Sequence, residues 1–193
     1  FKVKAIKEAL NKAFGISSRN INIAKDNEKV ALLLDESSSM GNGYNSPFTI
    51  GKTLMASMLC GLDKKNVIGY LWATTPREVK IDLKPMDFIK QTYSHGGGTD
   101  LKAAFKSLID RKTIVDKIVI FTDLQGWDST YLQLNDYIKE YKKISPNVKI
   151  LFWNLEGYAS GTPLELNKDV LEVEGYSDKI LEVIPYIWEN KNA

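Results

Sequence analysis

Asp35, Ser37 and Ser39 are the residues whose types and spacing most clearly indicate chemistry. They follow an apolar run, Val30 to Leu34, and in an open α/β sheet ligands collect where a strand ends and the chain turns toward a helix. If the segment after Asp35 is extended, alternate side chains share one side, so a carboxylate and two hydroxyls converge while Glu36 points away. Oxygen donors suit Mg²⁺ or Mn²⁺ better than zinc, for which the chain has one Cys and one His.

An Asp followed by serines is also typical of a turn or a helix N-cap, because both residue types bond nearby backbone N–H groups. Two later segments favour the metal site. A glycine run, residues 96–98, ends in Thr99 just ahead of a helical pattern. An apolar segment, residues 117–122, reads as a buried parallel strand that is followed by Asp123, which repeats the placement of Asp35.

Five residues carry a family resemblance: Asp35, Ser37, Ser39, Thr99 and Asp123. In this order, each at an expected strand-to-helix loop, they resemble the metal-ion-dependent adhesion site of von Willebrand factor A domains. The matching segments are LLLDESSSM, GGGTD and IVIFTD. The resemblance spans about residues 28–190, and within the superfamily the chain is most similar to the C-terminal domain of the Ro autoantigen (TROVE) family.

The resemblance implies a ligand set. Ser37, Ser39 and Thr99 would supply hydroxyls, and Asp35 and Asp123 would bind the ion directly or through water. One coordination position would stay open for an acidic group on a partner, because two carboxylates leave the cation part of its charge. We therefore expect a Mg²⁺- or Mn²⁺-dependent ligand- or protein-binding module, and not an enzyme.

The resemblance also implies a larger setting. In the Ro family the A domain packs beside a ring of helical repeats that binds RNA, and residues 1–16 resemble the last helix of such a ring. We expect residues 1–27 to be a helical tail and linker that ends an upstream helical domain, and residues 28–193 to be the vWA-like domain. RNA binding within the expected ribonucleoprotein would then belong to the upstream domain.

The chain departs from the usual family pattern beside the first aspartate. Glu36 stands where a small or apolar residue is more common, and Ser38 where Gly or Ala is common. Neither is expected to bind the ion. The extra negative charge of Glu36 would either strengthen cation binding or repel an acidic partner, and the sequence leaves both outcomes open.

The elements that must position these residues alternate between strands and helices, which predicts an α/β, Rossmann-like fold with a mostly parallel sheet and helices on both faces. The expected strands are residues 30–34, 67–73, 78–81, 117–122, 148–153 and 170–173. The expected helices are residues 4–14, 49–62, 86–93, 100–109, 131–141 and 177–188. Gly15 should stop the first helix, and Pro185 should kink or shorten the last.

Composition agrees with a single α/β domain. The 193 residues are 44% hydrophobic and carry a net charge of +2, so one core is expected and no strong basic footprint for nucleic acid. Cys60 is the only cysteine, which excludes an intrachain disulfide and favours a cytoplasmic location, and it is expected at a buried helix position. The sequence contains no apolar span of 18 residues, so we do not expect the domain to bind a membrane. Phe1 in place of Met indicates a fragment of a longer chain.

Other site types fit less well. Residues 51–53 look like the end of a phosphate-binding loop, but Ser46 stands where that loop needs glycine. A Ser-His-Asp hydrolase would need His95, the only histidine, and a strained nucleophile turn that is absent; His95 is expected to be a solvated loop residue. The remaining alternatives are a metal-dependent phosphoesterase, for which Asp35 and Asp123 lack the partners of a second ion, and a structural or assembly domain without a functional metal.

The tryptophans have different expected roles. Trp127 follows Asp123 on the edge of the proposed site and is expected either to anchor a partner or to pack in the core. Trp72, Trp153 and Trp188 lie in strand or helix patterns and are expected to pack between elements.

Overall fold

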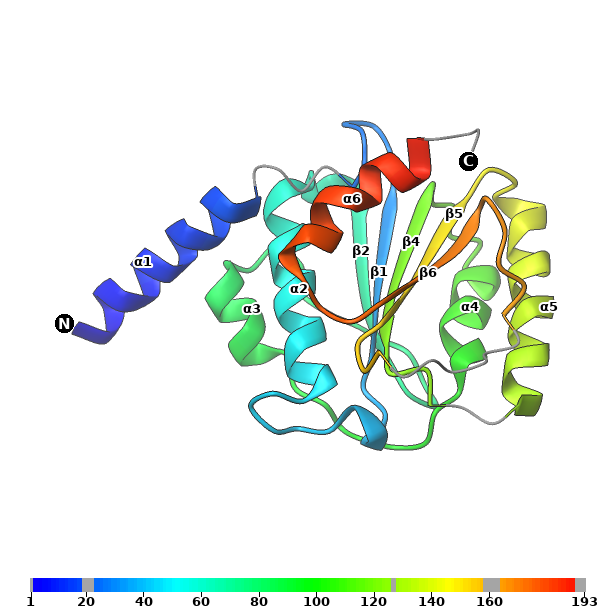
Figure 1. The fold of residues 1–193 in the computed structure, drawn as a ribbon, viewed down its shortest axis with the longest axis horizontal. Helices are drawn as coiled ribbons and strands as arrows, with labels where there is room; N and C mark the ends of the chain where they lie inside the picture. Colours follow the sequence, from blue (N-terminus) through cyan, green and yellow to red (C-terminus); the bar gives the residue numbers. More distant parts are fainter. Residues whose placement is uncertain (1, 19–22, 126–127, 158–163, 190–193) are drawn as a thin grey trace.

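A mixed β-sheet forms the centre of the molecule (Figure 1). The structure, a computed structural model, describes residues 2–18, 23–125, 128–157 and 164–189. In these ranges the sheet has six strands in the order β3-β2-β1-β4-β5-β6, all parallel except β3, which pairs antiparallel with β2. The expected α/β fold with a mostly parallel sheet is confirmed.

The bounds of the elements follow the predicted pattern closely. The strands are β1 Val30–Asp35, β2 Val67–Trp72, β3 Arg77–Glu78, β4 Lys117–Thr122, β5 Lys149–Asn154 and β6 Val170–Glu174. The α-helices are α1 Lys2–Ser17, α2 Pro47–Gly61, α3 Pro85–Gln91, α4 Leu101–Asp110, α5 Asp128–Ile144 and α6 Asp178–Glu189, and the 3₁₀ helices are η2 Ser38–Met40 and η3 Lys64–Asn66.

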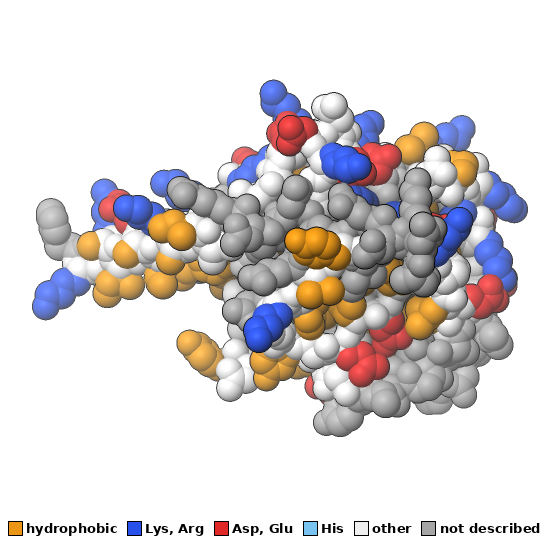
Figure 2. All heavy atoms as spheres, turned by 45° about the horizontal axis from the view of Figure 1, so that its top comes forward, with side chains coloured by type: hydrophobic (Ala, Val, Ile, Leu, Met, Phe, Trp, Pro, Cys, Tyr) orange, Lys and Arg blue, Asp and Glu red, His pale blue; other side chains and the backbone are white. Residues whose placement is uncertain are grey.

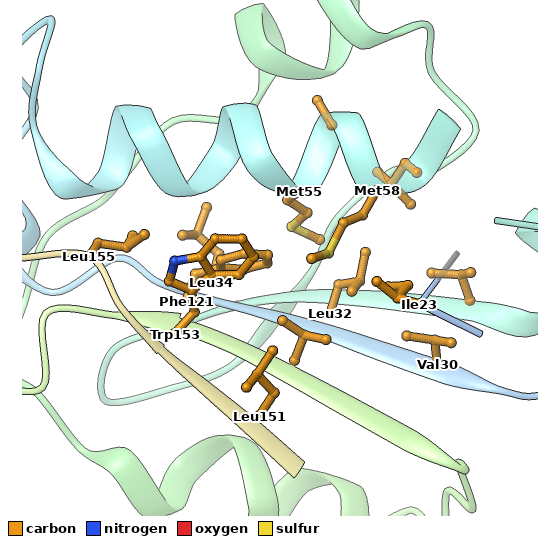
Figure 3. Packing of buried hydrophobic residues seen from close by; sticks show 14 of the residues in the cluster. Ile23, Val30, Leu32, Leu34, Met55, Met58, Phe121, Leu151, Trp153 and Leu155 are labelled. Atoms are coloured by element: carbon orange, nitrogen blue, oxygen red, sulfur yellow. The ribbon is translucent and has the colours of Figure 1, made fainter. Parts of the chain in front are cut away.

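Strand β1 divides its side chains between two hydrophobic layers. Leu32 and Leu34 face the layer that includes Met55 of α2 (Figure 3). Leu33 faces the opposite layer and packs in the cluster of Phe105 from α4. All five residues are fully buried, so β1 lies in the middle of the core and its end is held in a defined place.

Helix α2 approaches β1 very closely at Gly51. A Cβ atom at this position would lie 2.5 Å from Leu34 Cδ1 and 3.0 Å from Leu155 Cδ1, so a larger residue would force these buried leucine side chains to shift. The helix begins after Ser46, whose Oγ accepts a hydrogen bond from the backbone N–H of Thr49 at 3.3 Å. The glycine that resembled part of a phosphate loop therefore has a packing role.

The order of the strands changes direction between β1 and β4. From β1 the chain crosses to β2 on one side, and from β4 it crosses to β5 on the other. The two connections diverge between β1 and β4, and such a switch point leaves room for a ligand at the carboxyl ends of the strands. These ends lie at the bottom of the sheet in Figure 1.

Two expectations about helices concern residues that break them. Helix α1 continues through Gly15 to Ser17, so the expected stop at Gly15 is wrong; a glycine without neighbours weakens a helix by only about 1 kcal/mol, and nothing lies within 4 Å of the space its Cβ would fill. Helix α6 continues through Pro185 to Glu189 and is not shortened there, while the alternative of a kink at Pro185 stays a prediction. Both breakers are therefore tolerated in their helices.

Two further expectations need correction near the edge strand. The strand expected at residues 78–81 is the two-residue β3, because the chain then folds over Gly69 and places Val79 Cγ2 and Ile81 Cγ2 each 2.8 Å from the space of its Cβ. Cys60 is exposed, and not buried; its thiol donates to the carbonyl of Ala56 at 3.4 Å and borders a cavity of about 310 Å³ beneath the end of α1.

Helix α1 projects from the body of the domain (Figure 1). It is held through α3 by an ion pair between Lys7 and Asp87 and by Asn11 Oδ1, which accepts from the backbone N–H of Met86 at 3.0 Å. Val3, Ile6 and Leu10 are exposed and recur at helical spacing on one face, and Figure 2 shows a stripe of hydrophobic side chains along the projecting helix. Ile16 is also exposed. None of the helices in the described ranges is both long and apolar enough to cross a bilayer.

Candidate metal site

Asp35 is the last residue of β1 and is completely buried. Its Oδ1 accepts the backbone N–H of Ser37 at 2.8 Å, and its Oδ2 accepts the hydroxyl of Thr122 at 2.8 Å. Burial raises the pKa of Asp35 to about 7; the hydrogen bonds from Ser37 and Thr122 act against this, and the negative charge of Asp123 adds to it. Two carboxyl groups therefore share one desolvated place at the sheet edge.

Asp123 follows β4 directly and is also buried. Its Oδ1 accepts the backbone N–H of Gln125 at 3.1 Å. Its Oδ2 is buried and has no hydrogen-bond partner in the described part of the chain. A buried carboxylate oxygen without a partner costs free energy of folding, and a cation beside it removes that cost.

Ser37 and Ser39 bring their hydroxyls together, with 3.1 Å between the two Oγ atoms. The condition of an extended segment is not met beyond Ser37, however, because Ser38–Met40 forms the 3₁₀ helix η2. The tight turn, and not strand alternation, makes the two hydroxyls converge. Ser37 is buried and Ser39 is exposed, so the pair leads from the sheet edge toward solvent.

Thr99 is half-buried and ends a loop that is docked on the first segment of the site. The carbonyl of Gly97 accepts the N–H of Ser38 at 3.0 Å, and the N–H of Gly97 donates to Ser38 Oγ at 3.1 Å. On the other side of Thr99, the N–H of Asp100 donates to the carbonyl of Ala73 at 3.0 Å. Gly97 has φ of +120°, a conformation that requires glycine.

Glu36 points away from the site and is neutralised by a residue that sequence reasoning missed. Its carboxylate accepts Nε of Arg77 at 2.9 Å and Nη2 at 2.8 Å. The charge of Glu36 is therefore paired within the protein, and both open outcomes for its effect on a cation or a partner stay predictions. Thr122, which bonds Asp35 across the sheet, was also missed. Both partners are far away in sequence, so local spacing carried no signal for them.

The residues present suit a hard divalent cation. Asp35 and Asp123 influence each other, Ser37 touches Ser39, and Thr99 follows a loop that is bonded to the same turn. Within the described ranges, no three His, Cys, Asp or Glu side chains lie together as a metal cluster. A cation here would depend on hydroxyl and water oxygens besides the two carboxylates, which suits Mg²⁺ or Mn²⁺.

His95 and the tryptophans can be compared with their expected roles. His95 is exposed, as expected, and its ring lies 5.1 Å from that of Tyr93. Trp72, Trp153 and Trp188 are buried, which confirms their expected packing roles. Trp127 lies outside the described residues, so both of its expected roles stay predictions.

Solved structures share this fold, although no protein-family model and no curated protein matches the chain. The RO (RSR) protein of Deinococcus radiodurans superposes with a TM-score of 0.66 at 20% identity, over 96% of this chain and 38% of that one. The chain therefore spans well under half of that protein's length.

Two other solved structures are similar. An aerotolerance-related membrane protein from Bacteroides fragilis, in a form with multiple mutations to serines, has a TM-score of 0.57 at 12% identity, over 83% of this chain and 98% of that one. Proximal thread matrix protein 1 from the mussel byssus has a TM-score of 0.50 at 14% identity, over 83% and 44%. The strand order, the helices on both faces and these similarities show that the chain has a von Willebrand A-like fold.

Proposed function

We propose that this domain binds one Mg²⁺ or Mn²⁺ between the ends of β1 and β4 and uses the open coordination position to hold an acidic group of a partner. The observation that carries this proposal is that Oδ2 of Asp123 is buried and has no hydrogen-bond partner among the residues that the structure describes, beside an Asp35 whose pKa is raised to about 7. A divalent cation would satisfy both groups. Ser37, Ser39 and Thr99 would complete the protein's part of the shell.

The donor set supports binding more than catalysis. Neutral hydroxyls leave the cation with residual positive charge, which favours an anionic partner ligand. Phosphoester cleavage with two metal ions needs further carboxylate or imidazole ligands, and in the described ranges no such cluster adjoins Asp35 and Asp123. The competing proposal is a structural domain in which the same residues only order loops.

We also propose that the domain belongs to a Ro-like, cytoplasmic ribonucleoprotein in which an upstream helical domain binds RNA. The similarity to the RO (RSR) protein over 96% of the chain supports this, as does the exposed hydrophobic stripe of α1, which suits packing against further helices. Direct RNA binding by residues 28–193 would instead give an affinity that falls steeply with salt.

The test is isothermal titration of metal-stripped protein with Mn²⁺ and Mg²⁺, beside Asp35→Ala and Thr99→Ala variants whose folding is checked by circular dichroism. We expect one site in the wild type, lost in Asp35→Ala and weakened about 10-fold or more in Thr99→Ala. A wild type that binds neither ion, even with excess acetate to complete the shell, would leave the structural domain as the better explanation.

A further inference from the structure

We propose that Glu36 and Arg77 are positioning residues of the metal site, which hold the segment of residues 94–99 against the turn of residues 37–39. This inference rests on the proposed function, because it concerns how the same site is built. Neither residue would touch the ion. Their role would be to fix the place of the hydroxyl of Thr99 relative to the hydroxyls of Ser37 and Ser39.

Glu36 joins three separate parts of the chain at the point where β1 ends. It is 3% exposed. Its backbone N–H donates to the carbonyl of Trp72 at 2.8 Å, which ties it to β2. Its carbonyl accepts the hydroxyl of Ser94 at 2.8 Å, and its Oε2 accepts the N–H of His95 at 2.9 Å, which ties it to the loop before Thr99.

Arg77 completes the connection from the other side. It begins β3 at the edge of the sheet and binds both carboxylate oxygens of Glu36, an arrangement that fixes both side chains in orientation. Its Nη2 also donates to the carbonyl of Tyr93, and its guanidinium lies 5.3 Å from the centre of the Tyr93 ring. The loop is therefore held at three successive residues, Tyr93, Ser94 and His95.

The segment beyond these anchors depends on them. The three residues that follow are glycines, which have more backbone freedom than any other residue and lose more entropy when they are ordered. Beyond the anchors, Gly97 reaches Ser38 through two hydrogen bonds and Asp100 donates to the carbonyl of Ala73, and these bonds must order the glycine run without the support of residues 93–95 if the anchors are lost. A loop that is disordered before binding must be ordered when the ion binds, and this lowers the affinity.

A matched pair of substitutions separates positioning from general stability. Glu36→Gln removes the charge at the site but keeps the shape of the side chain. Glu28→Gln makes the same change at the opposite edge of the sheet, where Oε2 of Glu28 accepts Lys117 Nζ and the N–H of Lys25, each at 2.7 Å. Both glutamates thus bind one cationic side chain and one backbone N–H, but only Glu36 adjoins the site.

The experiment measures two quantities for both variants. Mn²⁺ affinity by isothermal titration should fall about 10- to 100-fold in Glu36→Gln and stay unchanged in Glu28→Gln. Amide hydrogen exchange of the metal-free protein should become faster over residues 94–99 in Glu36→Gln alone. Arg77→Lys keeps the positive charge but loses the two parallel hydrogen bonds to Glu36, so it should lie between Glu36→Gln and the wild type in both measurements. This variant replaces Glu36→Gln in the comparison if Glu36→Gln does not fold.

The outcomes keep the two proposals apart. If Glu36→Gln has wild-type affinity and exchange, or if Glu28→Gln weakens Mn²⁺ binding equally, the positioning role is refuted. If the wild type binds no Mn²⁺, the proposed function fails instead, and the exchange comparison in the metal-free protein still decides whether Glu36 and Arg77 hold the loop.

Discussion

The acidic residues at the two edges of the sheet have opposite pKa shifts. At the carboxyl edge, Asp35 and Asp123 are buried together, and burial raises the pKa of Asp35 to about 7. At the amino edge, Lys117 Nζ lies 2.7 Å from Glu28, and Asp169 lies between Lys149 at 2.5 Å and Lys142 at 3.1 Å. Partial burial acts to raise the pKa of Glu28 and Asp169, but the hydrogen bonds and charges of these lysines lower both below their ordinary values.

The difference lies in where the positive charge comes from. The amino edge carries its own cations, and Figure 2 shows Lys and Arg side chains beside Asp and Glu side chains on that face. At the carboxyl edge the nearby cation, Arg77, is already bound to Glu36, and Oδ2 of Asp123 has no partner within the described residues. The same residue types are therefore paired with lysines at one edge and, in the described part of the chain, left without a cation of their own at the other, which is the place where we propose that an external cation binds.

The largest expected contrast is in metal affinity. Asp123→Asn should weaken Mn²⁺ binding by at least about 100-fold, because a neutral amide replaces a carboxylate ligand. Asp169→Asn, the matched change at the amino edge, should leave the affinity unchanged and lower the free energy of unfolding by about 1 kcal/mol through its lysine pairs. Isothermal titration and urea unfolding measure these effects; equal loss of Mn²⁺ affinity in the two variants would remove the distinction between the edges.

The next contrast concerns pH and the metal-free protein. The pKa of Asp35 is about 7 in the folded state and about 3.9 when unfolded. Between these values the folded state keeps a proton that the unfolded state has lost, so this group's contribution to stability falls as the pH rises from about 4 to 7. Glu28 and Asp169 act oppositely: their lowered pKa gives stability above about pH 4, which is lost as the pH falls further.

Asp35→Asn isolates the first of these effects. In urea unfolding with a chelator present, the variant should be more stable than the wild type by about 2 kcal/mol near pH 8, because the cost of a buried charge is gone. Near pH 3 the difference should nearly vanish, since Asp35 is then protonated in both the folded and the unfolded state. An equal difference at the two pH values would show that the charge of Asp35 is not the cause.

The smallest expected effect is confined to the amino edge. Lys117→Met removes the cation beside Glu28 and its contact with the ring of Trp188, whose centre lies 5.1 Å from Lys117 Nζ. We expect the free energy of unfolding to fall by about 1 kcal/mol, with no change in Mn²⁺ affinity. Thermal unfolding of the chelated protein, with a parallel Mn²⁺ titration, measures both; weaker Mn²⁺ binding would mean that the two edges are coupled.

The central elements were predictable because their signals are local. A parallel strand buried on both faces reads as a continuous apolar run, and β4 has the predicted bounds, Lys117–Thr122. Ser46 and Pro47 indicate the start of α2, because serine is favoured at the N-cap of a helix and proline at its first position. Predictions of helix ends from glycine and proline were weaker, because Gly15 and Pro185 lie inside helices. These residues weaken a helix by free energies that its other contacts can exceed.

The sequence by itself determined which oxygen-bearing residues follow the ends of β1 and β4, because strand patterns and the residues after them are encoded within short segments. Only the tertiary structure decided that Thr122 bonds Asp35, that Arg77 neutralises Glu36, and that Oδ2 of Asp123 is buried without a partner among the described residues. The physical reason is that the charge balance and the desolvation of these carboxylates depend on neighbouring residues that lie tens of positions away in the chain. The register of the sheet brings these residues together.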